Sequence, residues 1–402
     1  MQSCATYKRI MQSAMSYQNR TDNTKIAPAR LYYSQLTIIL IRATLTIDDL
    51  YGQTFGENIA EFFVEETAMT LSNRKLATLL AVTTFLLAGA AHAETLRLST
   101  LKQPGSDGAQ AAEKFAKLVG ERTEGRIEIK VYPASQLGDW TEVYEQVMQG
   151  AVDMAMQPLA TADDKRLAIT WFPYAFTNYE TAKKSLSPGG AVFGIVSEAI
   201  SDKGLTPLGV YGEGMGGAGF AKAVEDPANT DLKRSLKIRV WPGGTTHRVL
   251  LERFGFNTAT LPWAELYTGM QTGVVDGQIG GTAGMALESF KDITKTWVQY
   301  NDHFEGDWFI INSEKHASLS EADQKILLDT AQEVSAERFE QVKAADAKAL
   351  ETMRGLGVEV VTFDDATLEK LAAVARAEVW PQIAGELGEE TLGKLKSSLG
   401  IN

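Results

Sequence analysis

The sequence predicts an α/β fold of two lobes, joined by hinge strands and spanned by one long helix. From Glu94 onward, short stretches in which polar and apolar residues alternate are separated by stretches with helical spacing. This pattern occurs twice, over residues 95–156 and again over residues 208–280. One uninterrupted helical stretch then runs from Ser320 to about Arg354. At 1.5 Å per residue it would reach roughly 50 Å, which exceeds one small domain.

The first half of the pattern predicts a parallel sheet with helices on its faces. Strands and helices follow one another in strict alternation, and crossovers of this kind join parallel strands. The expected strands are Thr95–Ser99, Arg126–Tyr132 and Val152–Met156, and the expected helices are Ala109–Glu121 and Trp140–Gly150.

The second half repeats this arrangement and ends with the long helix. Strands are expected at Leu208–Tyr211, Lys237–Val240, Gly277–Gly280 and Trp308–Asn312, and helices at Thr245–Phe254 and Ala264–Thr272. The long helix has Ser320 as its N-cap and is stopped by Gly355 and Gly357. Without a low-complexity linker, the lobes are expected to be residues 94–216 plus 305–344 and residues 217–304 plus 345–402, with several hinge crossings.

The stretch from Met69 to Ala93 has the features of a secretory signal. A basic segment, Asn73–Lys75, precedes an apolar run from Leu76 to Gly89, and Ala91–Ala93 forms a small-x-small cleavage site. The apolar run is shorter than the roughly 20 residues that a membrane span needs. A buried core helix is the alternative interpretation. We therefore expect a periplasmic protein that does not insert into the membrane.

Because signals stand at the N-terminus, residues 1–68 are expected to be a mis-assigned extension ahead of a true start at Met69. A genuine N-terminal arm is the alternative. Cleavage after Ala93 would leave 309 residues, and the single cysteine, Cys4, would be removed. This excludes a disulfide framework and a cysteine nucleophile. The net charge of −12 also makes nucleic acid a poor partner.

Six stretches of the chain, in order, resemble the solute-binding subunit of the tripartite ATP-independent periplasmic (TRAP) transporters, of the dicarboxylate-binding (DctP) type. They cover nearly all of the chain after the signal. The stretches are Phe115–Val119 with Thr123–Ile127, Tyr132–Gly138, Gly150–Met154, Leu236–Val240, Glu265–Tyr267 and Gln271–Gln278. The resemblance implies a periplasmic-binding-protein fold that captures a small organic acid and delivers it to membrane subunits driven by an ion gradient.

Arg239 is the residue on which the functional interpretation mainly depends. A guanidinium group can hold a carboxylate by two parallel hydrogen bonds, and the resemblance gives the matching arginine this role. An exposed strand arginine or a structural ion pair is the alternative. Trp263 matches a position where an aromatic ring lines the cleft; an isolated tryptophan is also commonly a core residue.

Five further residues complete the expected binding site. Gln157 ends a strand, where open sheets bind ligands, and Gln103 follows the first strand in the same relation. Glu213 is interpreted as an unpaired acid in a glycine-rich turn. It either contacts the substrate or is a solvated acid of the turn. Trp171 is expected to reach the ligand from a segment that mostly packs beneath the cleft. Gln278 lies in the last matching stretch.

Two departures from the family pattern affect the expected ligand. Ile279–Gly281 stands where the family commonly has Glu-Asn-Pro, so one polar contact would be lost and room gained. A second acid-binding arginine has no counterpart in Tyr211–Val224. These departures favour a hydroxylated, somewhat bulkier ligand with one carboxylate over a simple dicarboxylate.

The alternative function is a secreted nucleotide-dependent or metal-dependent enzyme. Gly212–Gly217 satisfies G-x-G-x-x-G, but the extra Gly219 and the early Pro227 do not favour the helix that a dinucleotide site requires. Residues 302–307 gather possible metal ligands without a known spacing and are interpreted as surface or interface residues. We therefore expect no enzyme activity, no cofactor and no resident metal, although a metal that assists ligand binding stays open.

Overall fold

The computed structural model describes residues 93–162 and 164–400. The expectations for the extension 1–68 and for the signal up to residue 92 lie outside these residues. Ten strands form one mixed sheet with the order β2-β1-β3-β9-β4-β7-β5-β6, and β8 joins it through β4 and carries β10. The strands are β1 (Glu94–Thr100), β2 (Ile127–Tyr132), β3 (Met154–Gln157), β4 (Leu205–Phe220), β5 (Lys237–Val240), β6 (Asn257–Thr260), β7 (Gly277–Thr282), β8 (Thr296–Val298), β9 (Phe304–Asn312) and β10 (Glu359–Val361).

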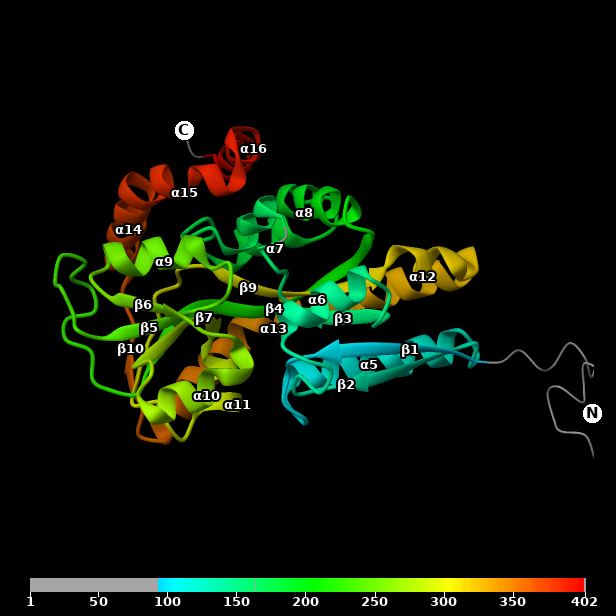
Figure 1. The fold of residues 1–402 in the computed structure, drawn as a ribbon, viewed down its shortest axis with the longest axis horizontal. Helices are drawn as coiled ribbons and strands as arrows, with labels where there is room; N and C mark the ends of the chain where they lie inside the picture. The colour runs from blue at the N-terminus through cyan, green and yellow to red at the C-terminus, as the bar shows by residue number, and fades with distance from the viewer. Residues whose placement is uncertain (1–92, 163, 401–402) are drawn as a thin grey trace, which may run out of the picture. The chain divides into compact units, whose positions relative to one another are not determined.

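Helices cover both faces of this sheet (Figure 1). They are α5 (Asp107–Arg122), α6 (Trp140–Met148), α7 (Tyr179–Leu186), α8 (Ala191–Ser201), α9 (Thr245–Arg253), α10 (Trp263–Thr272), α11 (Ala283–Phe290), α12 (Ser313–Ser318), α13 (Glu321–Gly355), α14 (Asp365–Val374), α15 (Trp380–Leu387) and α16 (Glu389–Leu399). A 3₁₀ segment, η1 (Lys165–Trp171), and a π segment, η2 (Ala375–Val379), complete the list.

The predicted two-lobed α/β fold is confirmed. Lobe I is built on β1, β2 and β3, which pair in parallel. Lobe II is built on β5, β6 and β7, which also pair in parallel. Two antiparallel strands, β4 and β9, connect them, because β4 pairs with β9 from Leu205 to Met215 and then with β7 from Gly216 to Phe220. The chain therefore passes between the lobes on paired strands.

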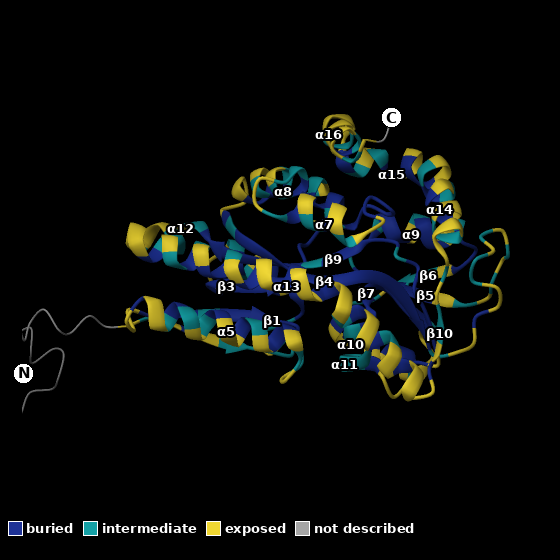
Figure 2. Ribbon diagram, turned by 180° about the vertical axis from the view of Figure 1, so that it is seen from behind, coloured by how far each residue is buried: buried dark blue, intermediate teal, exposed yellow. Residues whose placement is uncertain are grey.

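Helix α13 fastens the connecting strands from one face. Its N-cap is Ser320, whose side chain accepts from the Asp323 backbone N–H, and Gly357 follows its end with a φ of +83°, as the sequence predicts. Two buried charged side chains tie its middle to β4. Arg338 donates to the carbonyl oxygen of Gly212 at 2.8 Å, and Asp346 accepts from the backbone N–H of Met215 at 2.8 Å. Figure 2 shows the exposed stripe along the opposite face of α13.

The glycine-rich segment Gly212–Gly217 is not a turn, as the sequence suggested, but the middle of strand β4. Its glycines are required by close packing. At Gly214, whose φ is +136°, a side chain would overlap the Asp346 carboxylate of α13. The segment lies in a strand because it pairs with β9 and then with β7, and no helix opens at the third glycine.

The C-terminal helices pack on elements that precede and follow the connecting strands. Helix α15 lies against η1 and α9, and α16 lies against α8. The indole Nε1 of Trp380 donates to the carbonyl oxygen of Pro173 at 2.8 Å. Among the described helices, none combines the length and the apolar character that a bilayer crossing demands.

Candidate ligand-binding site

A pocket lies where residues of both lobes meet, at the carboxyl ends of β1, β3 and β5. This is where open α/β sheets commonly bind ligands. The free space in and around it, open solvent included, is about 240 Å³, but the part enclosed between its walls is small. Its lining consists of Leu101, Trp140, Pro158, Trp171, Arg239, Trp241, Trp263, Gly280 and Met285. Three of the seven predicted residues therefore share one site: Arg239, Trp171 and Trp263.

Arg239 is the charged residue of this lining, and it is 1% exposed. Its Nε donates to the carbonyl oxygen of Leu261 at 2.8 Å, and its guanidinium carbon lies 5.5 Å from the centre of the Trp263 ring. Its Nη2 has no hydrogen-bond partner among the described residues. Burial lowers the pKa of Arg239 to about 10, while Asp139 and Glu305 act in the opposite direction. The group is still charged at neutral pH, with one donor unused.

Two tryptophans form one wall of the pocket. The rings of Trp171 and Trp241 are 4.2 Å apart between centroids and inclined by 38°. Neither indole N–H has a hydrogen-bond partner among the described residues. At Gly280, where φ is +96°, an added Cβ would lie 2.6 Å from the Trp241 ring. The expected gain of room at Ile279–Gly281 is therefore wrong, because the Trp241 ring occupies that space.

Asp139 joins the two lobes beside the pocket. It is the N-cap of α6 in lobe I, where its Oδ1 accepts from the Thr141 backbone N–H at 3.1 Å. Its Oδ2 accepts from the backbone N–H of Ala264 at 3.1 Å, in the first turn of α10 in lobe II. The N-cap of α10 is Pro262, which has no side-chain acceptor to offer. One carboxylate thus serves two helix N-termini, where negative charge is favourable.

The three predicted glutamines lie outside the lining. Gln157 is buried, and its Nε2 donates at 2.6 Å to the carbonyl oxygen of Trp140, which does line the pocket. Gln278 stands beside Arg239 in the β5–β7 register, and its Oε1 has no partner among the described residues. Gln103 is half-buried in the loop after β1.

Glu213 is not an unpaired acid in a turn, as the sequence suggested. It lies in β4, and its Oε1 is 2.9 Å from the ammonium nitrogen of Lys102. The same nitrogen is 3.0 Å from Oδ2 of Asp307 in β9. All three side chains are buried. Burial opposes the charge of Lys102, but the two carboxylates outweigh it and raise the pKa of Lys102. We call these residues the Lys102 cluster.

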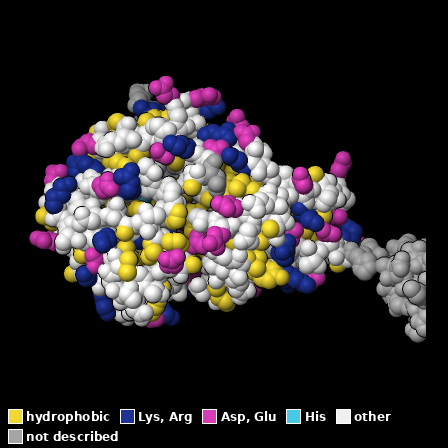
Figure 3. Space-filling view, viewed as in Figure 1, with side chains coloured by type: hydrophobic (Ala, Val, Ile, Leu, Met, Phe, Trp, Pro, Cys, Tyr) yellow, Lys and Arg dark blue, Asp and Glu magenta, His cyan; other side chains and the backbone are white. Residues whose placement is uncertain are grey.

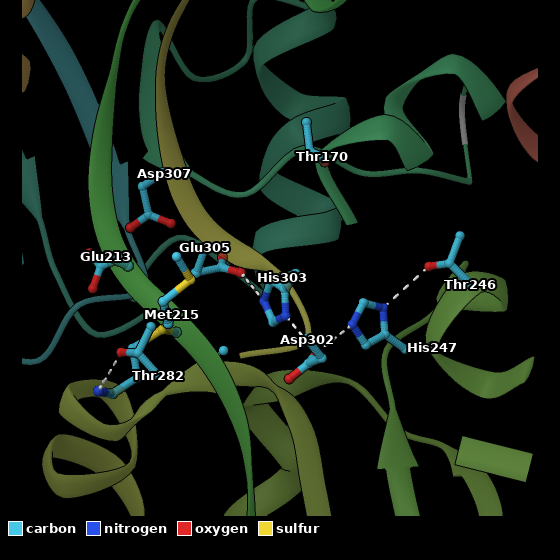
Figure 4. A network of polar contacts seen from close by, with 12 residues as sticks. Thr170, Glu213, Met215, Thr246, His247, Thr282, Asp302, His303, Glu305 and Asp307 are labelled. Atoms are coloured by element: carbon cyan, nitrogen blue, oxygen red, sulfur yellow. Dashed lines mark hydrogen bonds and ion pairs between the residues drawn. The ribbon is translucent and has the colours of Figure 1, made fainter. Parts of the chain in front are cut away.

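A second buried network contacts the two tryptophans through its histidine rings. Figure 4 shows the hydrogen bonds of this network. The ring of His303 lies between two carboxylates, with Nδ1 2.7 Å from Oδ2 of Asp302 and Nε2 3.0 Å from Oε2 of Glu305. Nε2 of His247 is 2.8 Å from the same Asp302 oxygen. The His303 ring is 5.1 Å from that of Trp171, measured between centroids. The expectation that residues 302–307 are at the surface or an interface is therefore wrong, since the ionisable ones are buried.

The two histidines have opposite protonation tendencies. Burial lowers the pKa of His303, but Asp302 and Glu305 outweigh burial and raise it to about 9. Burial dominates at His247, whose pKa is lowered. At neutral pH, His303 is thus an imidazolium that donates to both acids, and His247 is neutral. His247, Asp302 and His303 offer three ligand atoms within 4.8 Å of one another, so they could hold a metal ion only by giving up these hydrogen bonds.

Charged side chains on the outer face drawn in Figure 3 alternate in sign. Lysines and arginines are interspersed with aspartates and glutamates there, and no continuous basic stripe crosses the described part of this face. A nucleic acid backbone would find no extended positive track on it.

Two lobes joined by paired strands, with a buried cation in a pocket between them, define the class of two-lobed solute-binding proteins. Residues 98–386 match the family described as bacterial extracellular solute-binding protein, family 7. The chain belongs to this family. Its members are substrate-binding components of transport systems.

Similar proteins bind different acids. The chain is 28% identical over 253 residues to the 2,3-diketo-L-gulonate-binding periplasmic protein of Escherichia coli, covering 63% of this chain and 76% of that protein. It is 27% identical over 317 residues to the C4-dicarboxylate-binding periplasmic protein of Rhodobacter capsulatus, covering 75% and 90%.

Solved structures of TRAP periplasmic solute-binding proteins share the fold. One from Desulfovibrio salexigens, with bound orotic acid, has a TM-score of 0.69 and 23% identity, covering 76% of this chain and 98% of that one. The sugar acid binding protein of Advenella mimigardefordensis, in complex with galactonate, has a TM-score of 0.70 and 18% identity, covering 77% and 98%.

Several residues of the site were missed by sequence reasoning. Trp241 was not predicted. It stands two residues after Arg239, and side chains two apart along a strand point to the same face, so this spacing could have identified it. Trp140 and Asp139 gave a helix-start signal and no sign of a ligand site. Lys102 had no local signal, because its two acidic partners lie more than a hundred residues away.

Proposed function

We propose that this protein binds a small organic carboxylate between its lobes and delivers it to the membrane subunits of a TRAP-type transporter. The observation that carries the proposal is the unused Nη2 donor of Arg239, on a guanidinium that is 1% exposed. A buried charge without a close partner is costly, and a ligand carboxylate would supply the missing charge and acceptor. The similarity to binding proteins for diketogulonate and C4-dicarboxylates supports an acid as the ligand.

Binding would be coupled to closure of the two lobes. Among the hydrogen bonds between the lobes, two join loops and helix ends beside the pocket: Asp139 with the Ala264 backbone N–H at 3.1 Å, and the Thr161 hydroxyl with the Gly243 carbonyl oxygen at 2.9 Å. Ligand enters when these contacts part and is then enclosed as they re-form. A ligand that touches both lobes favours the closed state, because it binds that state more tightly.

The protein would act as a carrier and carry out no reaction on its ligand. It would reach the periplasm by cleavage of the signal that ends at Ala93. We propose residues 94–216 plus 305–344 and residues 217–304 plus 345–402 as the two lobes, with the C-terminal helices α15 and α16 of the second lobe also packing on η1 and α8 of the first. A secreted nucleotide-dependent enzyme is less favoured, because the glycine-rich segment lies within strand β4 and precedes no helix.

Isothermal titration of the purified chain with carboxylic acids tests this function. We expect at least one acid to bind and Arg239→Lys to weaken it by tenfold or more, because lysine keeps the charge but lacks the planar fork. Arg248→Lys, an exposed exchange of the same type, is the control and should change nothing. Equal affinity of Arg239→Lys and the unaltered protein would contradict the proposed role of Arg239.

A further inference from the structure

The walls of the pocket are aromatic to an unusual degree for a site that receives a charged ligand. Four of the seven tryptophans of the chain line it, namely Trp140, Trp171, Trp241 and Trp263. We infer that the pocket selects a flat aromatic monocarboxylate over dicarboxylates and sugar acids. The inference rests on the proposed function and adds the class of ligand.

The balance of donors and acceptors in the lining excludes ligands with many hydroxyl groups. Arg239 Nη2, Trp171 Nε1 and Trp241 Nε1 are buried donors without partners among the described residues. The lining side chains include no carboxylate, amide or hydroxyl group. Gln278, outside the lining, adds one unpartnered acceptor oxygen. Each further ligand hydroxyl would bury an unpaired donor, at a cost of roughly 1–3 kcal/mol. A suitable ligand therefore has acceptors and few donors.

The charges around the pocket allow one carboxylate. Arg239 is the cation of the lining. Lys102 follows the lining residue Leu101 and is buried, but its ammonium group already contacts Glu213 and Asp307. Buried Arg338 donates to the carbonyl oxygen of Gly212. A second ligand carboxylate would be buried without a counter-ion, which is strongly unfavourable.

The shape of the walls favours a planar ring. The guanidinium carbon of Arg239 lies 5.5 Å from the centre of the Trp263 ring, so a ligand whose carboxylate pairs with this guanidinium would have its ring beside aromatic side chains. Aromatic contacts contribute about 0.5–1.5 kcal/mol beyond their buried area. In the present conformation the enclosed part of the pocket has room for about one water molecule, so the lobes must part to admit any acid.

Titration calorimetry and tryptophan fluorescence of the purified chain, with the same set of probes, test the inference. The probes are 4-methoxyphenylacetate, phenylacetate, succinate and D-galactonate, with phenylacetamide as the uncharged analogue. We expect the two aromatic acids to bind at least tenfold more tightly than succinate and galactonate and to change the fluorescence. Phenylacetamide should bind at least tenfold more weakly than phenylacetate, because it lacks the charge that pairs with Arg239.

Three conservative variants locate the effect. Trp171→Phe and Trp241→Phe keep a ring but remove the unpartnered N–H, and each should weaken aromatic acids severalfold. Trp308→Phe is the control, because Trp308 is equally buried but stacks on Phe193 away from the lining. A loss in Trp308→Phe as large as in the other two would overturn the assignment of the tryptophan wall.

The outcomes separate this inference from the proposed function. If succinate or galactonate binds as tightly as the aromatic acids, and Arg239→Lys weakens it, the aromatic preference is wrong and the carboxylate site stands. If no acid binds, or if binding is the same in Arg239→Lys, the inference and the proposed function both fail.

Discussion

Two buried cations, Arg239 and Lys102, lie where the lobes meet and differ in whether a carboxylate pairs with them. Each is 1% exposed. Lys102 has two carboxylates within 3.0 Å of its ammonium nitrogen, and its pKa is raised. Arg239 has no ion pair within the described residues, and burial lowers its pKa to about 10.

The difference shows which charge is structural and which is available. A paired cation stabilises the acids around it and has nothing left for a ligand. An unpaired buried cation lowers the stability of the fold, and groups held at such a cost are typical of binding sites. The two residues should therefore respond differently to neutral substitution: Lys102 through stability and Arg239 through affinity.

The largest effect is expected for Lys102→Met. It leaves Glu213 and Asp307 buried without a counter-ion, which should lower the free energy of unfolding by about 3–5 kcal/mol. Urea denaturation at neutral pH measures this. A triple variant that adds Glu213→Gln and Asp307→Asn removes all three charges and should recover much of the loss. A stable Lys102→Met protein would remove the distinction between the two cations.

Arg239→Met should reverse this result. We expect ligand affinity to fall by about 2–5 kcal/mol, because the partner of the carboxylate is lost. The free energy of unfolding should stay constant or increase, because an unpaired buried charge is removed. Calorimetric titration and urea denaturation of one preparation measure both quantities. A variant that loses stability while it keeps its affinity would exchange the roles assigned to Arg239 and Lys102.

His303 gives a pH-dependent form of the same comparison. Its folded pKa is about 9 and its unfolded pKa about 6.5, so its stabilisation is complete below pH 6.5 and lost as pH rises through 9. We expect a decline of about 2–3 kcal/mol in unfolding free energy across this range. The pKa of His247 is lowered instead, so its protonation changes the free energy of unfolding only below about pH 6.5. Denaturation from pH 6.5 to 9.5 should show a smaller decline in His303→Gln.

The smallest effect is expected at the contact between the lobes. Asp139→Asn keeps one acceptor for the α6 cap but loses the negative charge and the second acceptor that serve α10. Ligand affinity should fall by about 1 kcal/mol, because the closed state is weakened. Thr161→Val removes the other contact and should add to this loss. Titration of both variants and their combination checks the additivity, and an unchanged affinity in the combination would rule out these contacts as closure bonds.

Local patterns were sufficient for most elements of the fold. The predicted strand Lys237–Val240 has the same bounds as β5, and the predicted long helix from Ser320 to about Arg354 is α13. Period-two alternation and helix caps are encoded by neighbouring residues, so sequence reveals them. The glycine-rich part of β4 was misassigned as a turn, because the strands that pair with it, β9 and β7, come much later in the chain.

By itself, the sequence determined most of the elements and the family resemblance and predicted Arg239 as the ligand contact, since these depend on residue type and short-range order. Only the tertiary structure decided which charges are paired. Glu213 could be assigned to Lys102 and Asp307, and Arg239 left with a free donor, only after β1, β4, β5 and β9 were brought together. Electrostatic pairing acts over a few ångströms in space, whatever the separation along the chain.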